Sequence, residues 1–181
     1  MGRLIASVLI AACAVQVVAL AATRGPIALH GPTVGRPLPD FGLVATLDGR
    51  QETWTSAIAT PHHCTLLVVI SPTCAACRRM RDTWSDRLSP WLDSVAAPVR
   101  PVWLIGATDT VARAFVAGYD LAPRTVVATI TTDVAQAGRA LGIVGTPTYY
   151  LLDRDGRLRV GVLGDEFPPA DSARHACRDR A

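Results

Sequence analysis

Cys74 and Cys77 are separated by two residues in the stretch SPTCAACRR, which directly follows the apolar run Thr65–Ile70. A short β-branched run before a helical pattern predicts that the pair lies at a strand-to-helix junction. At a helix N-terminus, free N–H groups and the helix dipole stabilise a thiolate. A cysteine three residues later lies one turn away on the same face. We therefore predict that Cys74 attacks a substrate disulfide and that Cys77 resolves the mixed disulfide.

Two other roles for this pair fit the sequence less well. A structural zinc site needs four ligands, and the chain has no second Cys-x-x-Cys. His62, His63 and Cys64 lie at the far end of the predicted strand, about 20 Å away. A structural disulfide across two residues would close a very small loop and stabilise little. We therefore expect disulfide exchange, with no metal and no cofactor.

A second motif, Gly145-Thr146-Pro147-Thr148, precedes the apolar run YYLL. Proline is tolerated in a strand at its first residue, so Pro147 is expected to open one. Together the two motifs resemble those of the thioredoxin superfamily. The resemblance implies a cis bond before Pro147, close to the redox pair. It also implies that the substrate-binding residues are Thr146, Pro147 and Thr73, the residue before the first cysteine.

A closer resemblance covers roughly residues 33–164. The opening Val34–Phe41 with the later LDGR turn, the segment Leu141–Thr148 and the segment Leu152–Gly156 resemble the TlpA-like membrane-anchored thioredoxins. This implies an α/β thioredoxin-like fold, with a central mixed sheet flanked by helices, an N-terminal β-hairpin and a central βα insertion. It further implies reduction of disulfides in exported proteins, apocytochrome c among them, with electrons from a membrane thiol donor.

The sequence departs from that family beside the cysteines. Thr73 and Ala76 stand where the family commonly has Trp and Pro, and Ser-Pro-Thr-Cys is similar to the methylamine-utilisation protein MauD. The strand Thr65–Ile70 carries no acidic residue, and Ala75 replaces the glutamate of some relatives. No obvious group therefore accepts the proton when Cys77 is activated, and the direction of the reaction stays open.

Hydrophobic patterns and turn residues predict alternating strands and helices. The expected segments are a hairpin of Phe41–Leu47 and Gln51–Trp54 around Asp48-Gly49, strands Thr65–Ile70, Val99–Ile105 and Val126–Ile130, a helix through Ala76, Met80, Trp84 and Leu88, a second helix from Ser89-Pro90, a helix capped by Asp109, a helix from Asp133 to Leu141, a hairpin of Thr148–Leu152 and Leu158–Leu163, and a short helix around Ala173–Cys177. We divide the chain into residues 1–23, an anchor or signal peptide; 24–40, a linker and leading loop; and 41–181, the thioredoxin-like domain.

The N-terminal run of residues 4–22 is apolar apart from Ser7 and Gln16. As a helix it would span about 28 Å, close to the thickness of a bilayer core. We favour an uncleaved anchor over a signal peptide cleaved at Ala19-Leu20-Ala21 or a lipobox ending at Cys13. Each form places residues 25–181 outside the cytoplasm. We expect a single-pass inner-membrane protein whose domain faces the periplasm or the extracytoplasmic side, where disulfides persist.

Cys64 and Cys177 either form a second disulfide or remain a small core residue and a tail thiol. The sequence does not fix the connectivity, and we favour the unpaired state. The 18 basic residues are all arginine, the net charge is +3, and the arginines are spread along the chain. This pattern gives no support to nucleic-acid binding.

Two other functions remain open. Ser71 lies three residues before Cys74, where peroxiredoxins carry Thr or Ser, but Leu67 replaces their upstream proline. A thiol peroxidase is therefore one alternative. The other is a copper(I) metallochaperone that uses Cys74 and Cys77, because soft thiolates suit copper(I).

Overall fold

The structure, a computed structural model, describes residues 32–39, 43–47, 50–54, 63–119, 121, 125–130 and 133–178. The predictions for residues 1–23, for most of the linker 24–40 and for the Asp48-Gly49 turn lie outside this part. In the described ranges, no helix is both long enough and apolar enough to cross a membrane.

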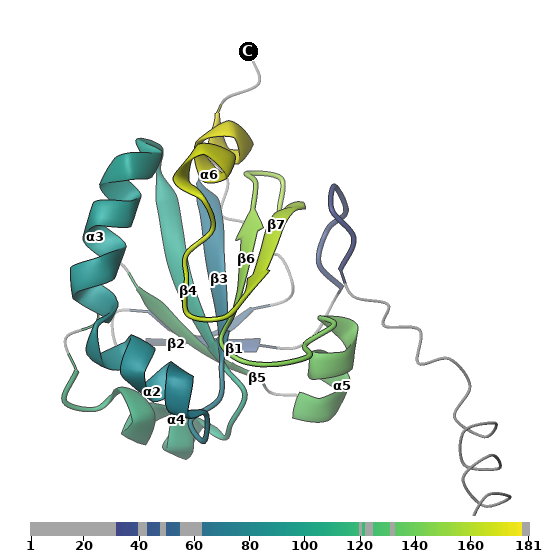
Figure 1. Cartoon of the computed structure of the whole chain (residues 1–181). Helices are drawn as coiled ribbons and strands as arrows, with labels where there is room; N and C mark the ends of the chain where they lie inside the picture. The colour runs from purple at the N-terminus through teal and green to yellow at the C-terminus, as the bar shows by residue number, and fades with distance from the viewer. Residues whose placement is uncertain are drawn as a thin grey trace, which may run out of the picture.

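A seven-stranded mixed sheet forms the centre of the molecule (Figure 1). Its order is β2-β1-β5-β4-β3-β6-β7. The strands are β1 (Leu43–Leu47), β2 (Arg50–Trp54), β3 (Cys64–Ile70), β4 (Val99–Ile105), β5 (Val126–Ile130), β6 (Thr148–Leu152) and β7 (Leu158–Leu163). The neighbours β3, β4 and β5 are parallel, and every other pairing is antiparallel. The α/β class, the mixed sheet and the N-terminal hairpin are thus confirmed.

Helices cover both faces of this sheet, as two separate hydrophobic clusters show. One cluster joins the sheet to α2 (Ala75–Asp82), α3 (Trp84–Val95), α4 (Asp109–Val116) and α6 (Ala170–Cys177), and the other joins it to α5 (Val134–Ala140). Every residue of β3 is buried, because alternate side chains point into opposite clusters. The continuous apolar run that predicted a central strand follows from this double burial.

The additional βα unit expected in the middle of the chain corresponds to α4 and β5. The latter strand lies beside β4, on the side away from β3. It also pairs with β1, so the N-terminal hairpin extends the sheet beyond it. A short loop joins the C-terminal end of β3 to the start of α2. The two cysteines lie at this junction, Cys74 just before α2 and Cys77 in its first turn.

The helix boundaries differ from the prediction at Pro90. The helix α2 ends at Asp82, and the hydroxyl and amide of its C-cap residue, Thr83, both bond to the Met80 carbonyl. The next helix, α3, begins at Trp84. Ser89-Pro90 therefore does not start a helix, and Pro90 lies within α3. Proline removes one backbone hydrogen bond, but burial of Leu88 and Trp91 on the opposite face holds the helix together.

Two helix starts that the sequence predicted have different outcomes. Asp133 caps α5, because its carboxylate accepts hydrogen bonds from the amides of Ala135 and Gln136. Asp109 does not cap α4; it is the first residue of that helix, and Thr108 occupies the cap position. A carboxylate in the first turn still interacts favourably with the helix dipole.

Candidate functional site

Cys74 is the N-cap residue of α2 and is partly exposed. Its sulfur accepts a hydrogen bond from the Cys77 amide at 3.2 Å, as an N-cap side chain does. The backbone reaches this position through a turn in which the Cys74 amide bonds to the Ser71 carbonyl at 3.1 Å. The strand-to-helix junction predicted for the cysteine pair is therefore present.

The two thiols have opposite tendencies to ionise. Burial by itself raises the pKa of Cys74, but contacts with Cys77 and Thr146 and with the amides of Cys77 and Ala76 together outweigh it and lower that pKa. Burial and the neighbouring Cys74 sulfur together raise the pKa of Cys77 to about 11. Cys77 is fully buried, whereas Cys74 faces solvent in part. Only Cys74 is therefore placed to attack an incoming disulfide as a thiolate.

The loop before β6 lies directly beside Cys74. The Thr146–Pro147 peptide bond is cis, as the resemblance implied. The Cys74 thiol donates a hydrogen bond to the Thr146 carbonyl at 3.1 Å, although 72 residues separate them. Pairing of Thr148 with Val69 brings this loop to the end of β3. The structure thus brings Cys74, Cys77, Thr146 and Pro147 together in one place.

Two exposed apolar side chains flank that loop, and the sequence analysis did not single them out. Val144 is 66% exposed and Leu163 is 56% exposed. Leu163 pairs with Thr148 across β6 and β7, and it lies against Gly145. Their only sequence signal was position: Val144 precedes Gly145-Thr146-Pro147, and Leu163 ends a predicted strand.

Thr73 and Ser71 lie on the other side of Cys74. Their hydroxyl oxygens are 2.9 Å apart, and Thr73 is exposed. Thr73 is therefore accessible beside the reactive sulfur, where we expected a substrate-binding residue. The Ser71 hydroxyl, whose spacing from Cys74 indicated the peroxidase alternative, is bonded to the Thr73 hydroxyl.

The arginines after the cysteines have different surroundings. Arg78 and Arg79 are exposed on the solvated face of α2. Arg81 instead packs against α4: its guanidinium lies 3.6 Å from the centre of the Tyr119 ring and bonds to the Phe115 carbonyl. This arginine is therefore a link between two helices, which the sequence did not indicate.

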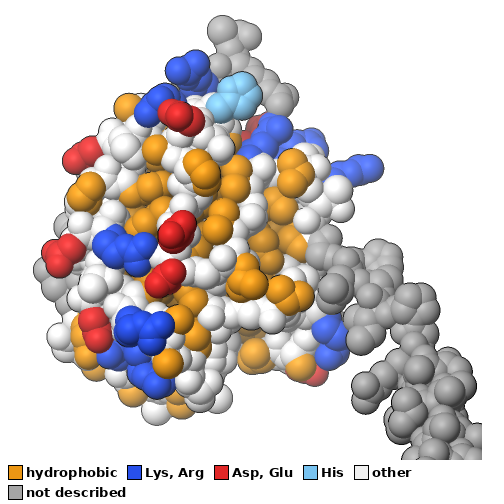
Figure 2. Space-filling view, viewed as in Figure 1, with side chains coloured by type: hydrophobic (Ala, Val, Ile, Leu, Met, Phe, Trp, Pro, Cys, Tyr) orange, Lys and Arg blue, Asp and Glu red, His pale blue; other side chains and the backbone are white. Residues whose placement is uncertain are grey.

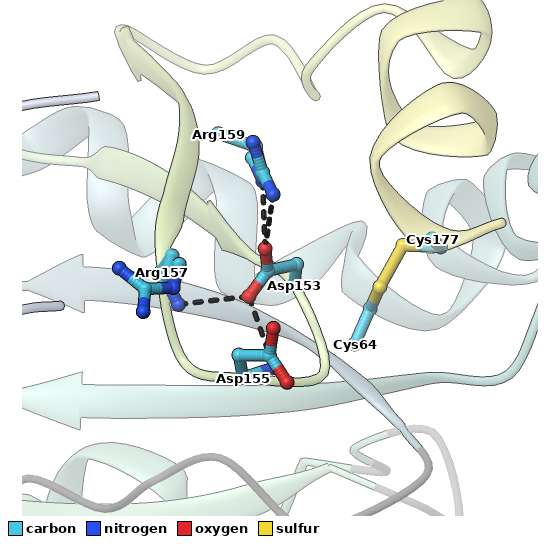
Figure 3. Close-up of a disulfide and its surroundings, with 6 residues drawn as sticks. All are labelled: Cys64, Asp153, Asp155, Arg157, Arg159 and Cys177. Carbon is cyan, nitrogen blue, oxygen red and sulfur yellow. Dashed lines mark hydrogen bonds and ion pairs between the residues drawn. A yellow bond between two sulfur atoms is a disulfide. The ribbon is translucent and has the colours of Figure 1, made fainter. Parts of the chain in front are cut away.

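The structure contradicts the unpaired state favoured for Cys64 and Cys177, because the two form a disulfide (Figure 3). Their Cα atoms are 5.7 Å apart across 113 residues of sequence. The end of α6 lies over the first residue of β3, a contact that no local pattern reveals. Both cysteines are buried. Because Cys64 begins β3 and Cys74 follows its end, this disulfide lies at the opposite end of the strand from the reactive pair.

Among the described residues, no group of three or more His, Cys, Asp and Glu side chains is placed to hold a metal ion. The two free thiols are the groups in this site that suit a soft metal, and they would supply two sulfur ligands.

No family model matches the sequence. No curated protein matches it either. Solved structures do match, among them a protein assigned as the thiol:disulfide interchange protein DsbE of Chlorobium tepidum, which is 23% identical with a TM-score of 0.56 over 78% of this chain and 92% of that one. StoA from Bacillus subtilis is 15% identical with a TM-score of 0.51, covering 76% of this chain and 96% of that one.

Another match is ScoI of Arabidopsis thaliana, solved with copper bound. It is 16% identical with a TM-score of 0.54, and the match covers 76% of this chain and 92% of that one. At these identities the likeness concerns the fold. The fold of this chain is the thioredoxin-like α/β fold.

Proposed function

We propose that this protein is a thiol–disulfide oxidoreductase that acts through Cys74 and Cys77 without a cofactor. The observation that carries the proposal is the difference between the two thiols. One caps a helix, is partly exposed and has a lowered pKa, while the other is buried with a raised pKa. The cis-proline loop beside Cys74 supplies a surface against which a substrate chain can lie.

The reaction needs only the two sulfurs and the substrate disulfide. The Cys74 thiolate attacks one substrate sulfur, which forms a mixed disulfide and releases the other substrate sulfur as a thiolate that takes up a proton. Cys77 then loses its proton and attacks the Cys74 sulfur. The second substrate thiol leaves, Cys74–Cys77 is oxidised to a disulfide, and the substrate has gained two electrons and two protons.

We assign the favoured direction as reduction, with exported proteins such as apocytochrome c as substrates and a membrane thiol donor that restores the dithiol. The TlpA-like resemblance supports this direction. The Cys64–Cys177 disulfide supports an extracytoplasmic location, because such bonds persist in oxidising compartments. In this proposal Thr73, Thr146 and Pro147 contact the substrate, and residues 1–23 anchor the domain to the inner membrane.

Trapping of the mixed disulfide tests the proposal. Cys77→Ser should accumulate a covalent adduct with a disulfide-containing peptide, because Cys74 still attacks and nothing resolves the product. Cys74→Ser should form no adduct and should lose exchange activity, since the remaining thiol is buried. Mass spectrometry of the intact protein measures both. Equal adduct formation by the two variants, or full activity of Cys74→Ser, would overturn the assignment.

A second candidate is a copper(I) carrier, favoured by the likeness to the copper-bound ScoI structure. Competition between the reduced protein and a copper(I)-specific chelator measures this directly. Copper binding that is lost in both Cys74→Ser and Cys77→Ser, with no exchange activity in the native chain, would favour the carrier. Peroxide consumption by the reduced protein tests the remaining alternative, a thiol peroxidase.

A further inference from the structure

A cavity of about 560 Å³ lies between β7 and α6, away from the cysteine pair. We call it the basic cavity, and its lining residues are Val34, Arg159, Val160, Ser172, His175, Ala176 and Arg178. Ser172, His175 and Ala176 recur at the spacing of one helix face, so α6 forms one wall. A β-bulge at Arg159 in β7 brings this arginine into the opposite wall.

Strand register places the basic cavity at the opposite end of the sheet from the reactive site. Val160 pairs with Leu151, and Leu151 pairs with Leu66, so the cavity is level with the beginning of β3. From Leu66 to Ile70 the strand advances about 13 Å, and Cys74 lies further along the chain in that direction. The proposed exchange site and this cavity therefore face different surroundings.

Part of the positive charge around this cavity is compensated. Asp153 forms an ion pair with Arg159 at 2.6 Å (Figure 3). On α6, Asp171 pairs with Arg174 at 2.8 Å, and Arg174 also bonds to the Ser94 carbonyl of α3. The carboxylate of Asp153 also accepts hydrogen bonds from the amides of Asp155 and Arg157, so this acid is fully engaged.

Other cations in the same region have no such partner among the residues that the structure describes. No carboxylate of a described residue forms an ion pair with Arg178, which is exposed at the end of α6. The same holds for Arg36 and Arg157, which the Pro37–Arg157 bridge holds near Val34. Figure 2 shows arginine and histidine side chains, with fewer acidic side chains among them, at the end of the molecule that carries α6. This end therefore has spare positive charge beside a cavity.

The sequence that precedes the described residues indicates which partner this positive charge could bind. Val34 lies in the cavity wall, and only residues 23–33 separate it from the apolar run 4–22. Eleven extended residues reach about 40 Å at most, so a membrane-embedded run keeps this end of the domain near the bilayer. Clusters of arginine next to a membrane segment attract anionic headgroups.

We propose that the basic cavity binds the phosphate of an anionic phospholipid headgroup, with Arg178 and His175 as contacts from α6. Binding there holds the α6 end of the domain against the membrane. The Cys74 end then points into the aqueous compartment. The proposal depends on retention of residues 4–22 as an anchor, and it is independent of the chemistry proposed for the cysteines.

Hydrogen–deuterium exchange of the full-length chain in nanodiscs tests this proposal. Discs of phosphatidylcholine are compared with discs that also contain phosphatidylglycerol. Residues 170–178 should exchange more slowly in the anionic discs, by about fivefold for each arginine engaged. Arg178→Gln combined with His175→Gln should abolish the difference. Arg113→Gln is the matched control, because it removes an exposed arginine from α4 and should retain the difference.

Three results would overturn the proposal. The first is equal exchange in the two kinds of disc. The second is equal protection in phosphatidylcholine discs when soluble glycerol 3-phosphate is added, which would assign the cavity to a free phosphate ester. The third is recovery of the chain outside the discs, which would show that no tether holds this end at the bilayer. None of these results depends on disulfide exchange, so failure here leaves the proposed function intact.

Discussion

Burial raises the pKa of the Cys77 thiol, whereas the position of Cys74 at the start of a helix lowers the pKa of its thiol. The amides of Cys77 and Ala76 are directed at the Cys74 sulfur and lower its pKa. The Cys77 sulfur has a backbone contact from Ser71 that also lowers its pKa, but burial outweighs it. Cys77 lies in the hydrophobic cluster with Met80 and Trp84. A low dielectric disfavours its thiolate, so it stays protonated at neutral pH, as the proposed resolving role requires before a mixed disulfide forms.

The raised pKa of Cys77 predicts a loss of stability at high pH. Because folding raises this pKa from 9.0 to about 11, the stabilising effect is complete below pH 9 and is lost as the pH rises through 11. Two pKa units correspond to about 3 kcal/mol. In Cys74→Ala the neighbouring sulfur no longer contributes to this shift. We therefore expect burial alone to cost roughly 1–2 kcal/mol of the free energy of unfolding between pH 8 and pH 11 in urea titrations.

The matched control for that measurement is Cys74→Ala combined with Cys77→Ala. It retains the buried tyrosines Tyr149 and Tyr150, whose pKa values are also raised by burial, but lacks the titrating thiol. Parallel stability curves for the two would contradict the assignment of Cys77 as a buried thiol.

At the scale of elements, α6 is held by more than the packing of one apolar face. The segment before it places Phe167 against Trp84, Trp91 and Tyr149, and the Trp91 indole bonds to the Pro168 carbonyl at 2.8 Å. The helix then ends in the disulfide to β3. Because α6 has only eight residues, these attachments stabilise a helix that would be marginal alone.

Removal of that disulfide should weaken the whole domain. Cys64→Ala combined with Cys177→Ala should lower the free energy of unfolding by about 2–5 kcal/mol, because the bond restrains a long loop of the unfolded chain. Urea titration followed by tryptophan fluorescence measures the change. The control is Cys74→Ser combined with Cys77→Ser. This variant removes two cysteines that are only two residues apart, and it should lower the free energy of unfolding by a smaller amount. An equal loss in both variants would show that α6 does not depend on its disulfide.

At the scale of the whole molecule, the two cysteine pairs lie at opposite ends of β3 and differ in access. Cys74 is partly exposed, whereas Cys64 and Cys177 are 0% and 1% exposed. A reductant must reach a sulfur in line with the bond that it breaks. The fold therefore separates the pair proposed to exchange from the buried Cys64–Cys177 disulfide.

Stepwise reduction should show this separation. In dithiothreitol buffers of increasing strength, alkylation and peptide mass spectrometry should detect free Cys74 and Cys77 well before free Cys64 and Cys177. The potential of the first step also reports the direction of the reaction. A value near or below about −250 mV would support reduction of substrates, and one near −120 mV would indicate an oxidant. Simultaneous release of all four thiols would contradict the separate roles.

Local patterns in the sequence determined much of this protein. The strands Val99–Ile105, Val126–Ile130, Thr148–Leu152 and Leu158–Leu163 were predicted with the bounds that the structure shows, and β3 differs by one residue. A strand that is buried on both faces appears in the sequence as a continuous apolar run, and a strand that is buried on one face appears as an alternation of apolar and polar residues. The positions of Cys74 before α2 and of Asp133 before α5 were also predicted from the sequence, because an N-cap side chain bonds to amides only two or three residues away.

Only the tertiary structure decided the features that join distant segments. The Cys64–Cys177 bond, the packing of Arg81 on α4 and the basic cavity each depend on where an element ends in space. The break at Thr83, with Pro90 inside α3, depends on the packing that outweighs the local preference of proline. The contact between Cys74 and the Thr146 carbonyl also depends on tertiary structure. The two residues are 72 positions apart in the sequence, and the pairing of β6 with β3 brings them together.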